Sequence, residues 1–173
     1  MQKNKIIIIG LGNEFISDDG VGIFVLRDLK SKLLSSLNDN HNFVFEELSV
    51  GGLGLLDYIS GFSKCLIVDT ILTRTQPPGT IYRFKQNSSD ELVKIKSSHQ
   101  INLPQVIGLA KLLKIDVPDE MIIYGIEGED ITTFKIGCTE KVQEAIPRLV
   151  NMIYKDVIKL YKENSWNKLN IMD

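Results

Sequence analysis

The chain has 173 residues, a length that fits one domain burying about two-thirds of its unfolded surface. Its 43% hydrophobic and 24% charged residues, with a formal net charge of −2, give no electrostatic basis for binding nucleic acid. Its apolar runs are much shorter than the roughly 20 residues of a membrane helix. Two widely spaced cysteines, Cys65 and Cys138, predict buried free thiols. We therefore expect a cytoplasmic protein without membrane insertion.

The first half of the chain alternates between strand and helix patterns. A run of four isoleucines at 6–9 predicts a central strand, and apolar residues at every fourth position of 21–33 predict an amphipathic helix. A second strand is predicted at 42–47, followed by a turn and a short helix. A third buried strand is predicted at 65–68, ending at Asp69.

The same alternation continues in the second half. A proline-glycine turn at 77–80 precedes a strand that runs through Phe84. The pattern of Leu103, Val106, Ile107, Ala110 and Leu113 predicts a helix, with Pro104 in a first-turn position where proline is tolerated. A short strand at 121–124 follows, and then a long helix over 142–157 that Pro147 is expected to kink.

Strands that alternate with helices predict a three-layer α/β/α sandwich around a mainly parallel sheet. We expect one catalytic domain at 1–163 and a polar, frayed tail at 164–173. In such sheets, ligands bind beyond the carboxyl ends of the strands. The residues that follow each strand are therefore the candidates for a functional site.

A glycine turn follows the first strand, in the segment "GLGNEFISDDGVG". The dinucleotide-binding fingerprint requires a third glycine, but Gly10 and Gly12 are followed by Asn13 and Glu14. Glu14 and the two aspartates further on would also repel a pyrophosphate. A glutamate after the second strand, Glu46 or Glu47, is only weak support for a ribose site. A nucleotide-using enzyme on a related fold stays open as an alternative.

The two adjacent aspartates of this segment, Asp18 and Asp19, have two explanations. With Ser17 they could cap the following helix, because acidic residues there accept free backbone N–H groups and favour the helix dipole. One acid would be enough for that purpose. The second could belong to a site formed with groups elsewhere in the chain.

Two further residues could join that site. Asp69 is expected at the carboxyl edge of the sheet, and His99 lies just before the helix predicted around 103–113. Taken singly, Asp69 could cap a turn, and His99 could be a surface or capping residue. Together with Asp19 they would offer two carboxylates and one imidazole, a set that suits a divalent metal such as nickel or zinc.

Four stretches of the chain together resemble the hydrogenase maturation endopeptidases, which process the large subunit of nickel-iron hydrogenases. They are "GLGNEFISDDGVG", "CLIVDT", "SSHQINLPQVIGLAKLL" and "YGIEGEDITTFKIGCTEKVQEAIPRL", and the likeness runs from about Lys5 to Val150. The resemblance implies a five-stranded α/β/α fold and an aspartic-type endopeptidase. It also implies that the protein removes a C-terminal extension from a large-subunit precursor.

The resemblance also assigns residues and a metal. The metal-contacting positions correspond to Asp19, Asp69 and His99, and the nickel is carried by the substrate rather than held as a cofactor. Substrate contacts are expected at the glycine turns and beside them, with the glycines letting the backbone approach a substrate tail: Gly10, Gly12, Asn13, Gly51 and Gly52. In this arrangement Asp18 is expected to cap the helix and Asn13 to brace the turn.

The chain departs from the family pattern in two places. Ser49 and Val50 stand where an acid and a threonine are usual, which puts that acid's role in substrate recognition in doubt. Gly128 replaces a proline after Glu127, and we expect Glu127 to be a strand-end surface acid.

Without a histidine near either cysteine in sequence, the residues favour metal-assisted hydrolysis, in which the metal polarises the scissile carbonyl or activates water. Three alternatives remain at this point: a nickel-sensing chaperone that holds the precursor uncut, a nucleotide- or nucleoside-using enzyme, and a metallopeptidase with its own zinc. We expect a monomer or weak homo-oligomer.

Overall fold

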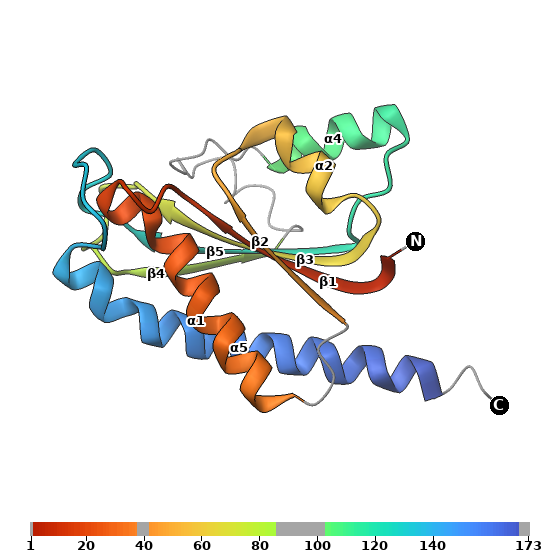
Figure 1. Cartoon of the computed structure of the whole chain (residues 1–173). Coiled ribbons are helices and arrows are strands. Elements are labelled where there is room, and N and C mark those ends of the chain that lie inside the picture. The colour runs from red at the N-terminus through yellow and green to blue at the C-terminus, as the bar shows by residue number, and fades with distance from the viewer. Residues whose placement is uncertain (1, 38–41, 86–102, 170–173) are drawn as a thin grey trace.

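The structure, a computed structural model, describes residues 2–37, 42–85 and 103–169. Within these ranges a sheet lies between two layers of helices (Figure 1). The predicted α/β/α sandwich is therefore confirmed. In the described part of the chain, no helix has both the length and the apolar character needed to cross a membrane.

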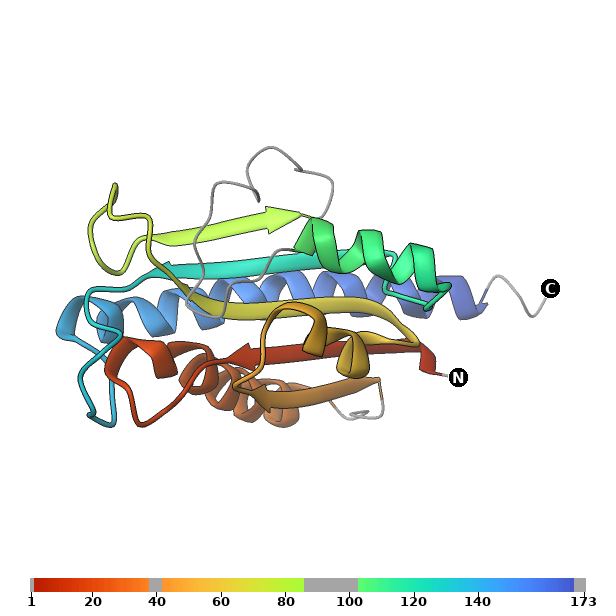
Figure 2. The same cartoon turned by 90° about the horizontal axis from the view of Figure 1, so that it is seen from above.

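One sheet contains all the named strands, which are β1 (Gln2–Leu11), β2 (Phe43–Leu48), β3 (Phe62–Ile71), β4 (Ile81–Lys85) and β5 (Glu120–Glu127). Their order across the sheet is β2-β1-β3-β5-β4, as Figure 2 shows from above. The pair β4–β5 is antiparallel, and the other pairs are parallel. The sheet is thus five-stranded and mainly parallel, as expected.

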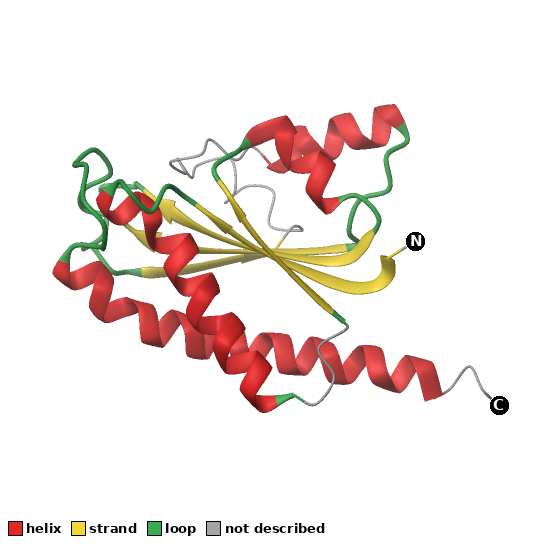
Figure 3. Ribbon diagram, viewed as in Figure 1, coloured by secondary structure: helices red, strands yellow, loops and turns green. Residues whose placement is uncertain are grey.

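Helices cover both faces of this sheet (Figure 3). They are the 3-10 helices η1 (Ser17–Gly20) and η2 (Gly52–Leu55) and the α-helices α1 (Val21–Ser36), α2 (Leu56–Ile59), α4 (Leu103–Leu113) and α5 (Glu140–Leu169). Helices α1 and α5 lie on one face, and α2 and α4 lie on the other.

The hydrophobic core has two halves because successive residues of a strand point to opposite faces. Ile6 and Ile8 of β1 pack toward α1 and α5, whereas Ile7 and Ile9 pack toward α2 and α4. All four are buried, which explains why β1 is a continuous isoleucine run rather than an alternating pattern.

Several predicted elements differ in detail from the structure. Strand β3 continues past Asp69 to Ile71, because residues 69–71 pair with residues 125–127 of β5. Leu113 is exposed rather than on the buried face of α4. Helix α5 is assigned without interruption through Pro147 and on to Leu169, so it extends into the segment expected to be a tail. The division of the chain at 163 stays a prediction.

The strand order identifies where a ligand would bind. Strand β1 lies between β2 and β3. The connection that follows β1 leads to β2 on one side, and the connection that follows β2 crosses back past β1 to β3 on the other side. Helices α1 and α2, which follow these two strands, cover opposite faces. The carboxyl ends of β1 and β3 therefore flank the position where α/β sheets of this kind bind ligands.

Candidate active site

The glycine turn after β1 packs against the chain itself. A Cβ atom added at Gly10 would overlap the carbonyl oxygen of Gly22, and one added at Gly12 would overlap the carbonyl oxygen of Asp19. Gly12 also has a φ of +152°. The close approach that these glycines permit within the chain is thus between β1 and the start of α1. The contact with a substrate tail that we expected of them stays a prediction. At Gly52, by contrast, the Cβ position is open and φ is +56°.

Asp18 does not cap the helix. Neither η1 nor α1, both in described segments, has a side-chain cap, and Asp18 is fully buried. Its Oδ1 accepts a hydrogen bond from the N–H of Thr139 at 2.7 Å, and its Oδ2 accepts bonds from the N–H groups of Glu129 and Asp130 at 2.8 and 2.9 Å. The Thr139 hydroxyl also donates to Oδ2 at 3.0 Å.

These bonds join two segments that are more than one hundred residues apart. The N–H of Asp18 donates to the carbonyl oxygen of Asp130 at 2.9 Å, so backbone and side chain hold the same loop. The expectation that Asp18 caps α1 was wrong because a distant loop supplies the N–H donors. Asp18 instead fastens the loop 129–139 to the turn that carries Asp19.

Asp19 is nearly buried, with 9% of its surface exposed. Its Oδ2 accepts a hydrogen bond from the N–H of Asn13 at 2.9 Å. Asn13 Oδ1 in turn accepts a bond from the N–H of Phe15 at 3.1 Å, which confirms that Asn13 braces the turn. The glycine turn and the carboxylate of Asp19 are therefore held together.

Asp69 comes to the same edge of the sheet from β3. It is fully buried, and its Oδ1 accepts a hydrogen bond from the N–H of Thr70 at 2.7 Å. The Thr70 hydroxyl donates to the carbonyl oxygen of Asp18 at 2.6 Å. Asp69 directly precedes Thr70, and that carbonyl belongs to the peptide joining Asp18 to Asp19. The fold thus places the backbone that carries Asp69 beside the backbone that carries Asp19.

The third predicted residue, His99, lies outside the described residues. Within the ranges that are described, no cluster of three or more His, Cys, Asp or Glu side chains is arranged to hold a metal. The assignment of Asp19, Asp69 and His99 as metal-contacting residues therefore stays a prediction. Carboxylate oxygens alone are ligands that fit several divalent cations.

Glu127 is buried, not a surface acid as we expected. Both of its carboxylate oxygens accept hydrogen bonds. Oε1 accepts one from the N–H of Arg74 at 2.8 Å, and Oε2 accepts from the hydroxyls of Thr73 and Tyr82 at 2.9 and 2.8 Å. Burial, together with this carboxylate, raises the pKa of Tyr82. Glu127 therefore holds the segment after β3 against the end of β5.

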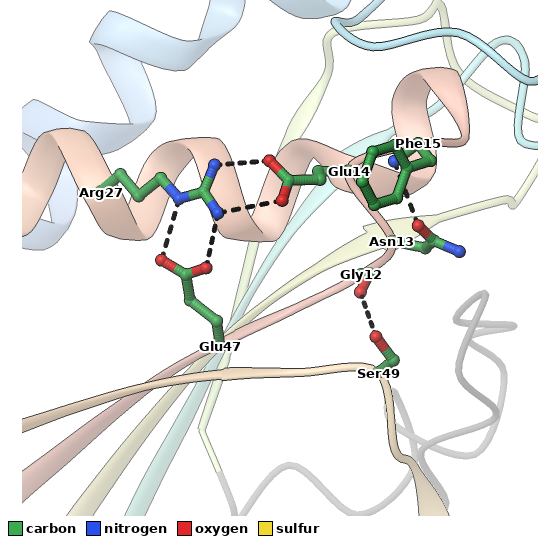
Figure 4. A network of polar contacts seen from close by, with 7 residues as sticks. All are labelled: Gly12, Asn13, Glu14, Phe15, Arg27, Glu47 and Ser49. Atoms are coloured by element: carbon green, nitrogen blue, oxygen red, sulfur yellow. Dashed lines mark hydrogen bonds and ion pairs between the residues drawn. The ribbon is translucent and has the colours of Figure 1, made fainter.

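An ion-pair network lies on the outer side of the glycine turn (Figure 4). The guanidinium of Arg27 in α1 binds Glu14 at 2.6 Å and Glu47, near the end of β2, at 2.7 Å. The hydrogen bonds to these carboxylates raise the pKa of Arg27, and the bond to Arg27 lowers the pKa of Glu14. Nearby, the Ser49 hydroxyl donates to the carbonyl oxygen of Gly12 at 2.9 Å.

This network weakens the nucleotide alternative. Glu47, considered above as a ribose-binding acid, already binds Arg27 through both of its oxygens. The network ties β2, the glycine turn and α1 together from outside.

Both cysteines are buried free thiols, as predicted. Burial raises the pKa of Cys65 well above its usual range. Burial and the nearby charge of Asp18 raise the pKa of Cys138 to about 12. Because the thiolate is the nucleophilic form, neither residue is suited to attack a peptide bond.

The family model of the hydrogenase maturation proteases (HycI) matches residues 29–156. The chain belongs to this family. A putative hydrogenase maturation protease of Methanocaldococcus jannaschii is 29% identical over 163 residues, which cover 92% of this chain and all of that protein. The delta subunit of the coenzyme F420 hydrogenase of Methanothermobacter thermautotrophicus is 26% identical, with 88% and 94% of the two chains covered.

Solved structures of such proteases share the fold. The hydrogenase maturating endopeptidase HybD of E. coli superposes with a TM-score of 0.73 over 90% of this chain and 93% of its own, at 18% identity. The [NiFe] hydrogenase maturation protease HybD of Thermococcus kodakarensis gives a TM-score of 0.63 at 25% identity, over 87% and 97% of the two chains.

Three residues near the candidate site of the protease have structural roles that the sequence did not predict. Asp18 and Glu127 both proved to be buried acceptors of several hydrogen bonds, and Arg27 joins two acids. Their partners lie between 13 and 121 residues away in the sequence, so no local pattern could have identified them. The one available signal was the pair Asp18–Asp19 itself, since one acid is enough for a cap.

Proposed function

We propose that this maturation protease removes the C-terminal extension of a hydrogenase large-subunit precursor and recognises the nickel that the precursor already carries. Asp19, Asp69 and His99 would contact this ion, which is part of the substrate. The observation that supports the proposal is the bond from Thr70 to the Asp18 carbonyl, which holds the backbone beside Asp19 against the backbone beside Asp69 at the carboxyl ends of β1 and β3. The T. kodakarensis relative is a [NiFe] hydrogenase maturation protease.

The chemistry follows from the two carboxylates and their burial. A divalent ion beside the scissile bond polarises the carbonyl or activates a water molecule, so the protein itself needs no nucleophile. The raised pKa values of both thiols agree with a mechanism in which the protein supplies no nucleophile. The work of the chain is then to hold two carboxylates, and by the proposal one imidazole, where the substrate-bound ion arrives. Because the ion comes with the client, the protease acts only on a loaded precursor.

The main test uses a purified, nickel-loaded large-subunit precursor whose mass is measured before and after incubation. Asp19→Asn, Asp69→Asn and His99→Ala should each abolish trimming while the proteins stay folded. Asp28→Asn is the matched control, since Asp28 is an exposed aspartate of α1. Trimming by all three variants at the wild-type rate would refute the residue assignment.

The same assay separates the proposal from the chaperone alternative. A precursor that binds tightly but keeps its full mass would indicate holding without cleavage. The nickel-free precursor should not be trimmed. If it is trimmed efficiently, nickel is not the recognition signal. We further propose that the reaction takes place in the cytoplasm, with the protease as a monomer or weak homo-oligomer.

A further inference from the structure

Three large apolar side chains are exposed beside the candidate site. The exposed fractions are 47% for Phe15, 82% for Phe134 and 66% for Ile136. The rings of Phe15 and Phe134 stack with centroids 6.1 Å apart and planes 11° from parallel. We call these three side chains the aromatic surface. Exposed apolar side chains that gather in one place mark interaction sites more often than isolated ones do.

Backbone hydrogen bonds join the two loops that carry this surface. The N–H of Ser17 donates to the carbonyl oxygen of Lys135 at 2.8 Å, and the N–H of Lys135 donates to that of Phe15 at 2.9 Å. In both overall views the loop before α5 lies beside the start of α1 (Figures 1 and 2). The aromatic surface is therefore one structure built from two distant segments.

Buried and local carboxylates hold this structure in place. The buried carboxylate of Asp18 accepts hydrogen bonds from the N–H groups of Glu129, Asp130 and Thr139, as described above. Asp130 Oδ1 accepts hydrogen bonds from the N–H groups of Thr132 and Thr133, both at 3.0 Å. The Thr133 side chain and then these N–H groups lower the pKa of Asp130 to about 2. A surface that is held in its bound shape loses less entropy when a partner binds.

The aromatic surface is continuous with the candidate site. Phe15 donates its N–H to the side chain of Asn13, and Asn13 donates its own N–H to Asp19. Two hydrogen bonds thus separate the aromatic surface from the carboxylate proposed to meet the nickel. A protein bound at this surface would therefore lie close to Asp19.

We propose that the aromatic surface docks an apolar segment of the folded precursor, next to the tail that is cut. This inference rests on the proposed function and adds the place where the client binds. A protein fits better than a small molecule, because Phe134 stands out from the surface and small ligands need a concave site. The charged residues of the same loop are mixed, with acidic Glu129 and Asp130 and basic Lys135, and they lack the cluster of basic residues that binds an anionic membrane.

The test compares the double variant Phe134→Ser/Ile136→Ser with the control Leu112→Ser. Leu112 is 81% exposed, which matches Phe134, but lies near the end of α4 toward the opposite edge of the sheet. With the nickel-loaded precursor, the double variant should raise KM about tenfold and leave kcat within about twofold, since it removes binding rather than chemistry. The control should match the wild type in both constants.

An unchanged KM in the double variant would overturn the inference, as would an equal rise in the control. If the wild type is dimeric in sedimentation and the double variant is monomeric, the surface pairs two copies and the inference is also wrong. If the wild type does not cut the precursor, the proposed function fails, and direct binding then decides: weaker binding of the double variant supports docking. Equal binding, or no binding by the wild type, refutes it.

Discussion

Acidic residues have different surroundings at the two ends of the parallel strands. At the edge where β3 and β5 begin, Glu120 pairs with Lys64 at 3.2 Å and with Lys85 at 3.6 Å, and all three side chains are partly exposed. At the edge where β1 and β3 end, Asp18 and Asp69 are fully buried and accept hydrogen bonds from N–H groups. Lysine side chains and water stabilise the carboxylate at the first edge, and oriented N–H donors stabilise the carboxylates at the second.

This difference indicates which edge carries the function. A partly exposed ion pair contributes little to stability and constrains little. A buried carboxylate is costly unless several donors are fixed around it, so it ties together every segment that supplies a donor. The carboxyl edge is therefore the one where buried acids join several segments, at the position where α/β sheets bind ligands. The four predictions below test this contrast, from the largest expected effect to the smallest.

Removal of the Asp18 carboxylate should have the largest effect. Asp18→Ala leaves three N–H groups and a hydroxyl without their acceptor in a buried place, so we expect a loss of about 3–5 kcal/mol in unfolding free energy. Urea unfolding measures it, with Asp28→Ala on the exposed face of α1 as control, expected to change stability by about 0.5 kcal/mol or less. Equal stability of the two variants would mean that the loop 129–139 is held by something else.

The reactivity of the Cys138 thiol should report its burial first and the nearby charge of Asp18 second. With the pKa raised from 9.0 to about 12, Cys138 in a Cys65→Ser background should react with iodoacetamide at pH 9 on the order of a hundredfold more slowly than a free thiol.

The sign of the pH effect follows from the same shift. An unfolded thiol loses its proton near its usual pKa, so the stability from the neutral Cys138 is complete below pH 9.0 and decreases as the pH rises toward about 12. Unfolding measured through this range should show that decrease in Cys65→Ser and a smaller one when Cys138 is also replaced. If Cys138 reacted with iodoacetamide as fast as a free thiol, its side chain would be accessible to solvent and the prediction would be wrong.

Two glycines should respond to alanine with opposite signs. At Gly10 the new Cβ would overlap Gly22 and lie 2.9 Å from the Cβ of Leu26, so Gly10→Ala should cost about 1–3 kcal/mol. At Gly108, exposed in α4 with nothing within 4 Å, Gly108→Ala should stabilise by about 0.5–1 kcal/mol. Thermal or urea unfolding measures both. A neutral Gly10→Ala would mean that β1 and α1 can separate at little cost.

The Arg27 network should matter least. Arg27→Met removes both ion pairs shown in Figure 4, yet the guanidinium side chain is 44% exposed, so we expect a loss of only about 0.5–1 kcal/mol. The loss should shrink further at about 1 M salt, because exposed charges are screened. A loss as large as that of Asp18→Ala, unaffected by salt, would place this network among the buried interactions instead.

How much of the site the sequence could predict varied from residue to residue. Asp19 and Asp69 were expected at one sheet edge because parallel strands align their carboxyl ends, and the bond from Thr70 to the Asp18 carbonyl confirms that edge. The roles of Asp18 and Glu127 were predicted wrongly, because short-range capping rules cannot include donors from distant loops. His99 lies outside the described residues, so its role stays a prediction.

The sequence by itself determined the layers, the mainly parallel sheet and the family, since these follow from local apolar periodicity and from motifs in a fixed order. Only the tertiary structure decided which of the two adjacent aspartates faces inward to Thr139 and which bonds the glycine turn through Asn13. The reason is physical: neighbouring carboxylates look alike in a sequence, and the hydrogen-bond donors that distinguish them arrive only when β1, β3 and the loop before α5 fold against each other.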